Sequence, residues 1–129
     1  MVGGAAAVDS GKTLQRAVVA IVEGLGLEAK QEVTVGRRIW GPQRRIDVVV
    51  RDPGSRTTLG IECKWQGSKG TAEEKIPATI EDIRAWPIRG LVVYDGPGFS
   101  PNMESYLIST GKAVRLDELA QWLKLYFAL

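Results

Sequence analysis

Residues 59–66 read Leu-Gly-Ile-Glu-Cys-Lys-Trp-Gln, and the rest of the chain is best interpreted outward from this stretch. Apolar side chains at the odd positions alternate with polar ones, which predicts a β-strand with two chemically different faces. The polar face carries Glu62, Lys64 and Gln66, spaced about 7 Å apart because a strand rises about 3.3 Å per residue. A carboxylate, an ammonium group and an amide therefore stand in one row.

A second strand is predicted at residues 45–51, and it carries another carboxylate, Asp47. The segment between the two strands is rich in turn formers, which favours a hairpin. Pairing through that hairpin would bring Asp47 beside Glu62 and Lys64. The alternative is that Glu62 and Lys64 lie on the solvated face of an edge strand. The order of the predicted strands argues against it, because this strand would lie inside the sheet, where charged side chains need partners.

Asp47 followed by Glu62-Cys63-Lys64 resembles the Asp…(Asp/Glu)-x-Lys signature of the PD-(D/E)XK nuclease superfamily, over about residues 10–95. The resemblance implies an α/β fold, a restriction-endonuclease-like or Holliday-junction-resolvase-like mixed β-sheet flanked by helices, with an α-β-β-β-α-β core. It also implies metal-dependent hydrolysis of phosphodiester bonds. Matching positions then make Asp47, Glu62 and the backbone carbonyl of Cys63 ligands of Mg²⁺ or Mn²⁺, with Lys64 beside the attacking water.

The charges of the two predicted carboxylates also favour a bound cation between them. Two carboxylates that face one point repel each other, so placing Asp47 beside Glu62 is costly unless a cation lies between them. The chain has one cysteine and no histidine, which excludes an internal disulfide and a zinc site built on His or Cys. Any metal would be held by oxygen atoms, as Mg²⁺ and Mn²⁺ are. The cysteine itself, Cys63, has the opposite parity to Glu62 and is expected to be a small buried hydrophobe.

Two glutamines extend the predicted site. Gln66 gives the pattern Glu-x-Lys-x-Gln, a variant found in some branches of the superfamily, and is expected to position water or phosphate. The superfamily often adds an acidic residue from the first helix, where this chain offers Gln15 and Glu23. Gln15 borders the predicted buried stripe, whereas Glu23 points away from it. Gln15 is therefore the better match, and its lack of charge leaves a second metal ion open.

Basic side chains around the predicted turn at Gly41-Pro42, and shortly after residue 66, form the expected nucleic-acid-binding surface. They can neutralise phosphates, and an aromatic ring among them can stack on a base. The alternative is a solvated hairpin tip, and the two interpretations are weighed evenly. The predicted contact residues are Arg37, Arg38, Trp40, Arg44, Arg45, Lys69 and Lys75.

The totals fit a single globular unit. The chain has 129 residues, 44% hydrophobic and 25% charged, which are ordinary values for one domain. A net charge of +2 is only a mild bias toward polyanions. Residues 1–8 lack the features of a signal peptide, and no apolar run reaches the roughly 18 residues of a membrane span. A cytoplasmic location without a membrane partner is therefore expected.

Periodicity predicts the remaining elements. Residues 1–9 are expected to form a flexible arm and residues 10–129 a single domain. The strand at 91–94 is apolar on both parities and is expected to be buried and parallel to a neighbour. Helices are predicted at 11–23, 77–86, 102–109 and 117–127, and strands at 31–40, 45–51, 59–66, 91–94 and 112–115.

The sequence thus predicts a divalent-metal-dependent DNA endonuclease that acts on duplex or branched DNA. A homodimer is one arrangement that would place two such sites at a fixed spacing. The alternative function is a catalytically inactive nucleic-acid-binding or assembly domain of the same fold. A third reading is an enzyme that cleaves another phosphodiester, such as RNA.

Overall fold

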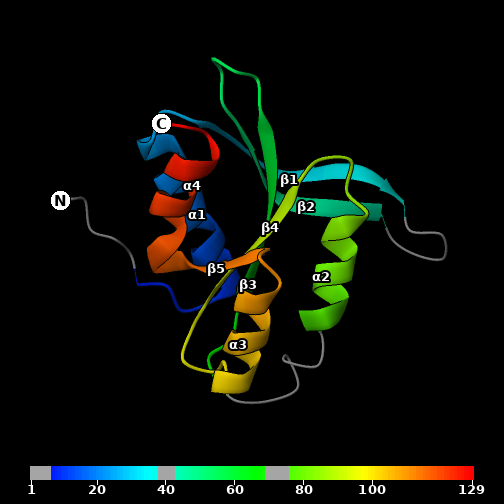
Figure 1. Cartoon of the computed structure of the whole chain (residues 1–129), viewed down its shortest axis with the longest axis vertical. Helices are drawn as coiled ribbons and strands as arrows, with labels where there is room; N and C mark the ends of the chain where they lie inside the picture. Colours follow the sequence, from blue (N-terminus) through cyan, green and yellow to red (C-terminus); the bar gives the residue numbers. More distant parts are fainter. Residues whose placement is uncertain (1–6, 38–42, 69–75) are drawn as a thin grey trace.

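The structure, a computed structural model of the 129-residue chain, describes residues 7–37, 43–68 and 76–129. Helices and strands alternate through these ranges, and Figure 1 shows their arrangement. In chain order the elements are α1 (Gly11–Gly24), β1 (Glu28–Arg37), β2 (Gln43–Arg51), β3 (Thr58–Trp65), α2 (Ile76–Arg84), β4 (Gly90–Asp95), α3 (Pro101–Ser109), β5 (Ala113–Arg115), the 3₁₀ helix η2 (Leu116–Glu118) and α4 (Leu119–Tyr126).

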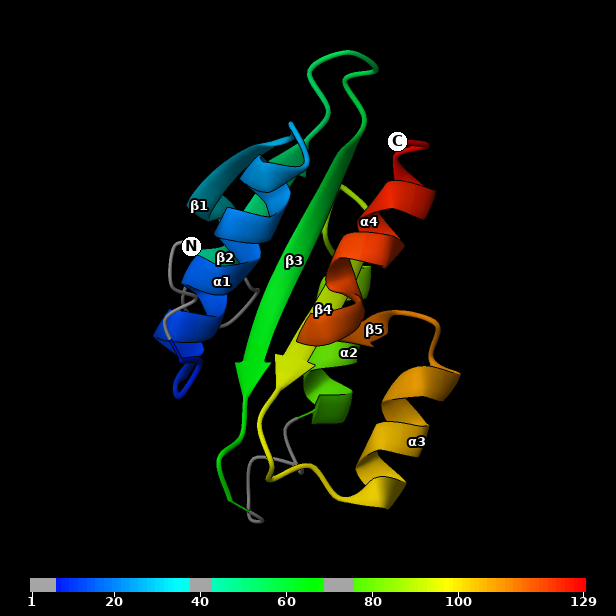
Figure 2. The same ribbon diagram turned by 90° about the vertical axis from the view of Figure 1, so that its left-hand side faces the viewer.

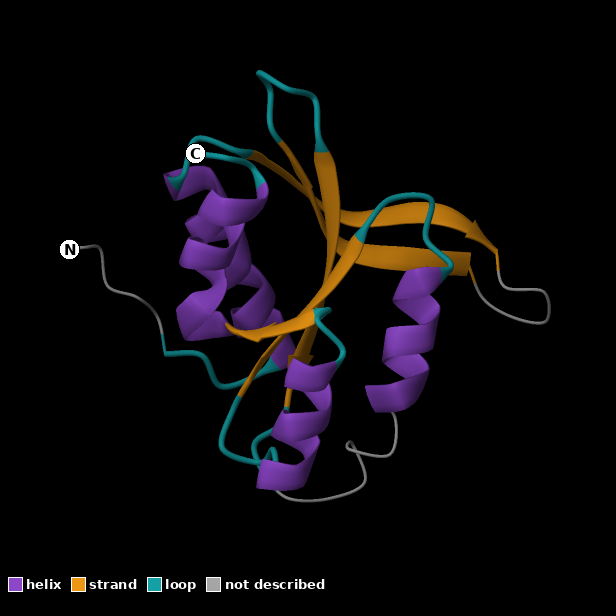
Figure 3. Cartoon of the chain, viewed as in Figure 1, coloured by secondary structure: helices purple, strands orange, loops and turns teal. Residues whose placement is uncertain are grey.

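The five strands form one mixed sheet in the order β1-β2-β3-β4-β5 (Figure 3). β1, β2 and β3 are antiparallel neighbours, and β4 and β5 continue the sheet in parallel. The predicted hairpin between β2 and β3 is confirmed, with Arg51 opposite Thr58 and Val48 opposite Ile61. β3 is therefore an interior strand, as the sequence predicted.

Helices cover both faces of the sheet. Figure 2 shows α1 in front of β2 and α4 in front of β4, with α2 behind the sheet. Leu91 and Val93 of β4 pack with α1 and α4, whereas Val92 and Tyr94 pack with α2 and α3. This two-sided burial explains why β4 is apolar at successive positions, and it confirms the predicted parallel, buried strand.

The first helix begins as predicted. The Ser10 hydroxyl accepts a hydrogen bond from the Thr13 backbone N–H at 3.1 Å, and the Thr13 hydroxyl accepts one from the Ser10 N–H at 2.9 Å. Thr13 thus takes the place that glutamate or glutamine holds in the usual capping box. The helix buries Leu14, Val18 and Val22 against the sheet, so the predicted stripe is confirmed.

Two predicted boundaries were wrong. β1 begins at Glu28 instead of residue 31, because Glu28 already pairs with Arg51 at the start of the ladder, whereas the predicted end at residue 40 lies outside the described residues. The last helix begins as the 3₁₀ turn η2 before α4 starts at Leu119. In the described part of the chain, no helix combines the length and the apolar character needed to cross a membrane.

Candidate active site

The ladder between β2 and β3 runs from Arg51–Thr58 to Val48–Ile61. Beyond the Val48–Ile61 pair, the acceptor for the β3 backbone is the Asp47 side chain. Its Oδ2 accepts a hydrogen bond from the Cys63 N–H at 2.9 Å. This bond fixes the Asp47 carboxylate beside β3. The hairpin therefore brings Asp47 to the Glu62–Cys63 segment, as the sequence predicted.

The Glu62 carboxyl lies against that of Asp47 on the face of the sheet that α2 covers. Burial is the largest cause that raises the pKa of Glu62 from 4.5 to about 8, and the neighbouring Asp47 carboxyl, through its hydrogen bond and its negative charge, contributes in the same direction. Lys64 lowers the pKa of Glu62, but its effect is smaller. Burial and the Asp47 carboxyl thus both favour the protonated form of the Glu62 carboxyl over its charged form.

These groups fit a hard cation. Glu62 Oε1 is buried and has no hydrogen-bond partner among the residues that the structure describes, so this carboxylate oxygen is available as a ligand. A strand residue directs its N–H and its C=O to the same side, so the Cys63 carbonyl lies on the Asp47 side of β3. Two carboxylates and a carbonyl are the oxygen ligands that Mg²⁺ prefers, with water completing the octahedron.

Side chains alone do not complete such a site. No group of three or more His, Cys, Asp or Glu side chains that could hold a metal ion occurs within residues 7–37, 43–68 and 76–129. The two carboxylates would therefore depend on backbone, water or substrate oxygens for the remaining ligands.

A cleft of about 690 Å³ opens from Glu62 and Lys64 toward α2. Arg44 of β2 also lines it, and α2 forms the opposite wall with Ala78, Thr79, Glu81 and Asp82. None of these helix residues was predicted as part of the site. The only signal in the sequence was the polar pair at positions 79 and 82, which share one face of the helix beside the buried isoleucines of α2.

Gln66 lies just beyond the end of β3, and its side chain is 5% exposed. The side-chain Nε2 of Gln66 donates a hydrogen bond to the Gly98 carbonyl at 2.7 Å. The backbone carbonyl of Gln66 accepts one from the Gly98 N–H at 2.9 Å. These bonds attach the loop between β4 and α3 to the end of β3. The Nε2 of the amide that the sequence predicted for water or phosphate is thus bound to the protein backbone, whereas its Oε1 is buried without a hydrogen-bond partner among the described residues.

Gln15 is directed away from the carboxylates. Its Nε2 donates to Gln31 Oε1 of β1 at 3.1 Å. α1 packs on the opposite face of the sheet from α2, whose cleft holds Glu62 and Lys64. The structure therefore does not join Gln15 to Asp47 and Glu62 through any described contact. Glu23 is exposed, as predicted.

The predicted nucleic-acid-binding residues are described only in part. Arg45 is exposed, with its Nη1 3.9 Å from Glu32 Oε1, whereas Arg44 is turned into the cleft. Arg37 lies at the end of β1, but its side chain is outside the described part of the structure. The same holds for the whole of Arg38, Trp40, Lys69 and Lys75.

Cys63 is half-buried and packs against the cluster under α1 and α4. Burial raises the pKa of its thiol, and the charges of Asp47 and Glu62 add to the effect. A thiol in this environment stays protonated, which agrees with a packing role and disfavours a nucleophilic one.

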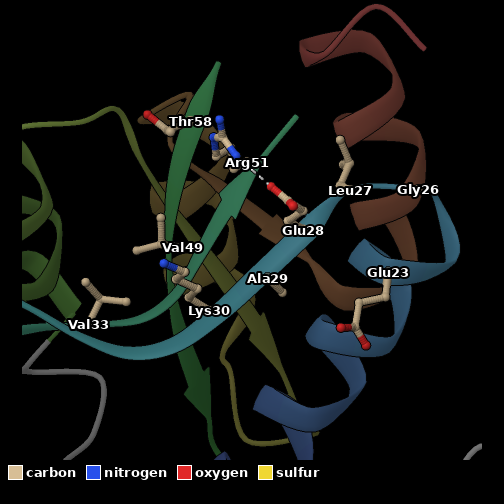
Figure 4. Close-up of a pocket in the computed structure, with 10 residues that line it drawn as sticks. All are labelled: Glu23, Gly26, Leu27, Glu28, Ala29, Lys30, Val33, Val49, Arg51 and Thr58. Atoms are coloured by element: carbon tan, nitrogen blue, oxygen red, sulfur yellow. Dashed lines mark hydrogen bonds and ion pairs between the residues drawn. The ribbon is translucent and has the colours of Figure 1, made fainter. Parts of the chain in front are cut away.

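A second hollow, of about 940 Å³, lies at the open edge of β1 and β2 (Figure 4). It shares no lining residue with the cleft. Its charges are balanced within the protein, since Arg51 Nη1 lies 2.9 Å from Glu28 Oε1. Glu62 and Lys64 instead line the smaller cleft, and Asp47 lies beside Glu62.

The molecule thus combines a mixed sheet, helices on both faces, and two carboxylates with a lysine on neighbouring strands. A family profile described as a PD-(D/E)XK nuclease superfamily domain matches residues 6–124, and the chain belongs to that superfamily. Both the predicted resemblance and the predicted fold class are confirmed. Nucleases of this superfamily generally use divalent metal ions.

Solved structures share the fold at low sequence identity. The protein of unknown function AF1548 is 21% identical, with a TM-score of 0.53 over 78% of this chain and 55% of that one. VC1899 from Vibrio cholerae is 18% identical, with a TM-score of 0.50 over 91% of this chain and 32% of that one. A repair endonuclease from Pyrococcus abyssi is 11% identical, with a TM-score of 0.48 over 84% and 47%.

The chain thus spans about half the length of AF1548 and about a third of that of VC1899. A comparison with curated proteins gave no significant match.

Proposed function

We propose that this protein is a divalent-metal-dependent DNA endonuclease that hydrolyses phosphodiester bonds. The observation that carries the proposal is the meeting of the Asp47 and Glu62 carboxyls where the β2–β3 ladder ends, with Lys64 in the adjoining cleft. Membership of the PD-(D/E)XK nuclease superfamily supports the same activity. Asp47, Glu62 and Lys64 are the proposed catalytic residues.

Asp47, Glu62 and the Cys63 carbonyl would hold Mg²⁺ or Mn²⁺. The bound ion would polarise the scissile phosphate and lower the pKa of a water molecule. The hydrogen bond from the Cys63 N–H fixes Asp47 before any ion arrives, which limits the reorganisation that binding requires. A ligand carboxylate must be ionised, and the pKa of Glu62 is raised to about 8, so binding of the ion near neutral pH would release a proton from Glu62.

Lys64 contributes a positive charge on the same face of β3 as Glu62. Negative charge accumulates on the phosphoryl oxygens as the phosphodiester is attacked, and a fixed ammonium group stabilises it. The cleft is bounded by β3 and α2, so the charge acts in a partly water-excluded space.

Cleavage assays with duplex, single-stranded and branched DNA and with RNA, each with Mg²⁺ or Mn²⁺, test the proposal. Asp47→Asn should lower the cleavage rate at least about 100-fold because a charged ligand is lost. Asparagine retains an oxygen that can accept from the Cys63 N–H, so the fold should be preserved. Nucleic-acid binding should also be preserved.

Asp52→Asn is the matched control. Asp52 Oδ1 also accepts a backbone hydrogen bond, from the Gly54 N–H at 3.0 Å, but it lies in the β2–β3 turn. This variant should cleave at the wild-type rate. Binding without cleavage by the wild-type protein would instead support the inactive nucleic-acid-binding domain, and cleavage of RNA alone would replace DNA as the substrate.

A further inference from the structure

Arg44 lies in the active-site cleft with Glu62 and Lys64. The sequence places it in a basic cluster at a hairpin tip, beside Arg45. The structure separates the two, because both lie on β2, where consecutive side chains point to opposite faces of the sheet. Arg45 is 60% exposed, whereas Arg44 is 22% exposed.

The Arg44 guanidinium is fixed by two contacts with α2 and the residues that follow it. Its Nε lies 3.3 Å from Asp82 Oδ1, and its Nη1 donates to the Ala85 carbonyl at 3.3 Å. A cation held in this way loses little conformational entropy when it binds a ligand. The cleft thus contains, on β2, a guanidinium that contacts with the α2 side hold in place before a ligand arrives.

The two contacts involve Nε and Nη1, and Nη2 makes no hydrogen bond or ion pair among the described residues. A guanidinium carries five N–H groups in a planar fork, the arrangement that binds phosphate at two points. Among the described residues, the bond to the Ala85 carbonyl is the one hydrogen bond that Arg44 makes. Lys64 is the other cation that lines the cleft, and it faces the proposed site of cleavage from β3.

We infer that Arg44 binds a second phosphate of the DNA backbone, beside the phosphate that Lys64 faces. This inference rests on the proposed function, because it assigns a substrate contact in the same cleft. A purely structural explanation also exists. Arg44 would then only neutralise Asp82 and satisfy a carbonyl beyond the C-terminus of α2, where cations are favoured.

DNA binding as a function of salt separates the two explanations. The parent protein is Asp47→Asn, which should bind without cleaving, and fluorescence anisotropy with labelled DNA gives its Kd at several NaCl concentrations. Adding Arg44→Gln should raise the Kd about 5- to 20-fold at low salt and reduce the slope of log K against log [NaCl] by about 0.7–0.9, the share of one phosphate. Adding Arg44→Lys should keep the slope and recover part of the affinity, since lysine is a point charge without the fork.

Arg51→Gln is the matched control, since Arg51 lies on the same strand but pairs with Glu28 outside the cleft. Its Kd and slope should equal those of the parent. Unchanged Kd and slope in Arg44→Gln, with a lowered unfolding temperature, would overturn the phosphate contact and leave the nuclease proposal intact. A parent that binds no DNA or RNA would overturn both. If Arg44→Gln fails to fold, Arg44→Lys decides, because an unchanged Kd would reject the two-point contact.

Discussion

Trp86 packs directly on Gly60, so closely that a Cβ atom at Gly60 would lie 2.7 Å from the indole ring. Gly90 pairs with Gly60 across β3 and β4, and a Cβ atom there would lie 2.9 Å from the same ring. The two glycines thus provide a flat backbone surface for the indole. Because Trp86 follows α2, this contact helps to hold α2 over β3, where it forms a wall of the cleft.

Gly60→Ala should destabilise the protein by about 1–3 kcal/mol, since the ring and the helix must move to admit the methyl group. Urea denaturation measures the change. Gly24→Ala is the matched control, because Gly24 ends α1 with no atom within 4 Å of an added Cβ. That variant should be neutral or more stable by up to about 1 kcal/mol. Equal stabilities of the two variants would contradict the packing argument.

The stability of the metal-free protein should depend on pH through Glu62. Its pKa is about 8 in the folded protein and 4.5 in the reference state, so the folded state holds the proton more tightly. This contribution to stability is complete below pH 4.5 and is lost as the pH rises through about 8. The unfolding temperature in EDTA should therefore fall over that interval.

Glu62→Gln provides the comparison, because its neutral amide resembles the protonated carboxyl at every pH. The unfolding temperature of this variant should fall less over the same interval. The difference between the two curves isolates Glu62 from other titrating groups. Parallel curves would show that Glu62 does not titrate in this range.

Mg²⁺ or Mn²⁺ should stabilise the wild-type protein near pH 8. A cation that binds only the folded state adds about 2.7 kcal/mol at 100 times its Kd. The effect should grow with pH, because the cation displaces the proton of Glu62. Glu62→Gln and Asp47→Asn should each lose most of this stabilisation in thermal-shift measurements. Glu28→Gln, which changes an exposed carboxylate on β1, should retain it.

Gln66→Met should reduce stability by about 1–3 kcal/mol, because the Gly98 carbonyl loses its donor in a buried setting. The cleavage rate of the folded variant should fall less than about 10-fold if the amide serves the loop alone. Gln121→Met, an exposed change on α4, should have neither effect. A large loss of cleavage at unchanged stability would return Gln66 to the catalytic role that the sequence predicted.

Local patterns were enough to predict the hairpin that carries the site. Alternation fixed the faces of β3, and turn formers located its connection to β2, so Asp47 and Glu62 could be placed together. The fully apolar β4 was likewise predictable as a buried parallel strand. In each case the information lies within a few residues of the element concerned.

The surroundings of the other predicted residues depend on contacts between distant elements, which the sequence does not give. Arg44 and Asp82 are 38 positions apart, and only the packing of α2 on the sheet brings their charges to 3.3 Å. Gln66 has the parity of Lys64, but β3 ends at Trp65, and the loop at Gly98 then determines where the amide bonds. Helical periodicity correctly placed Gln15 beside the buried stripe of α1. Periodicity does not say, however, which face of the sheet the helix will cover.

The bond between Asp47 Oδ2 and the Cys63 N–H has a consequence for the evolution of the chain. The acid occupies its place because β2 and β3 keep one register, and that register is set by the connection between Arg51 and Thr58. Slippage by one residue would turn every β2 side chain to the other face. The exposed β2–β3 turn should therefore tolerate substitution but not insertion or deletion. Relatives that keep Asp47 should also keep the length of this turn.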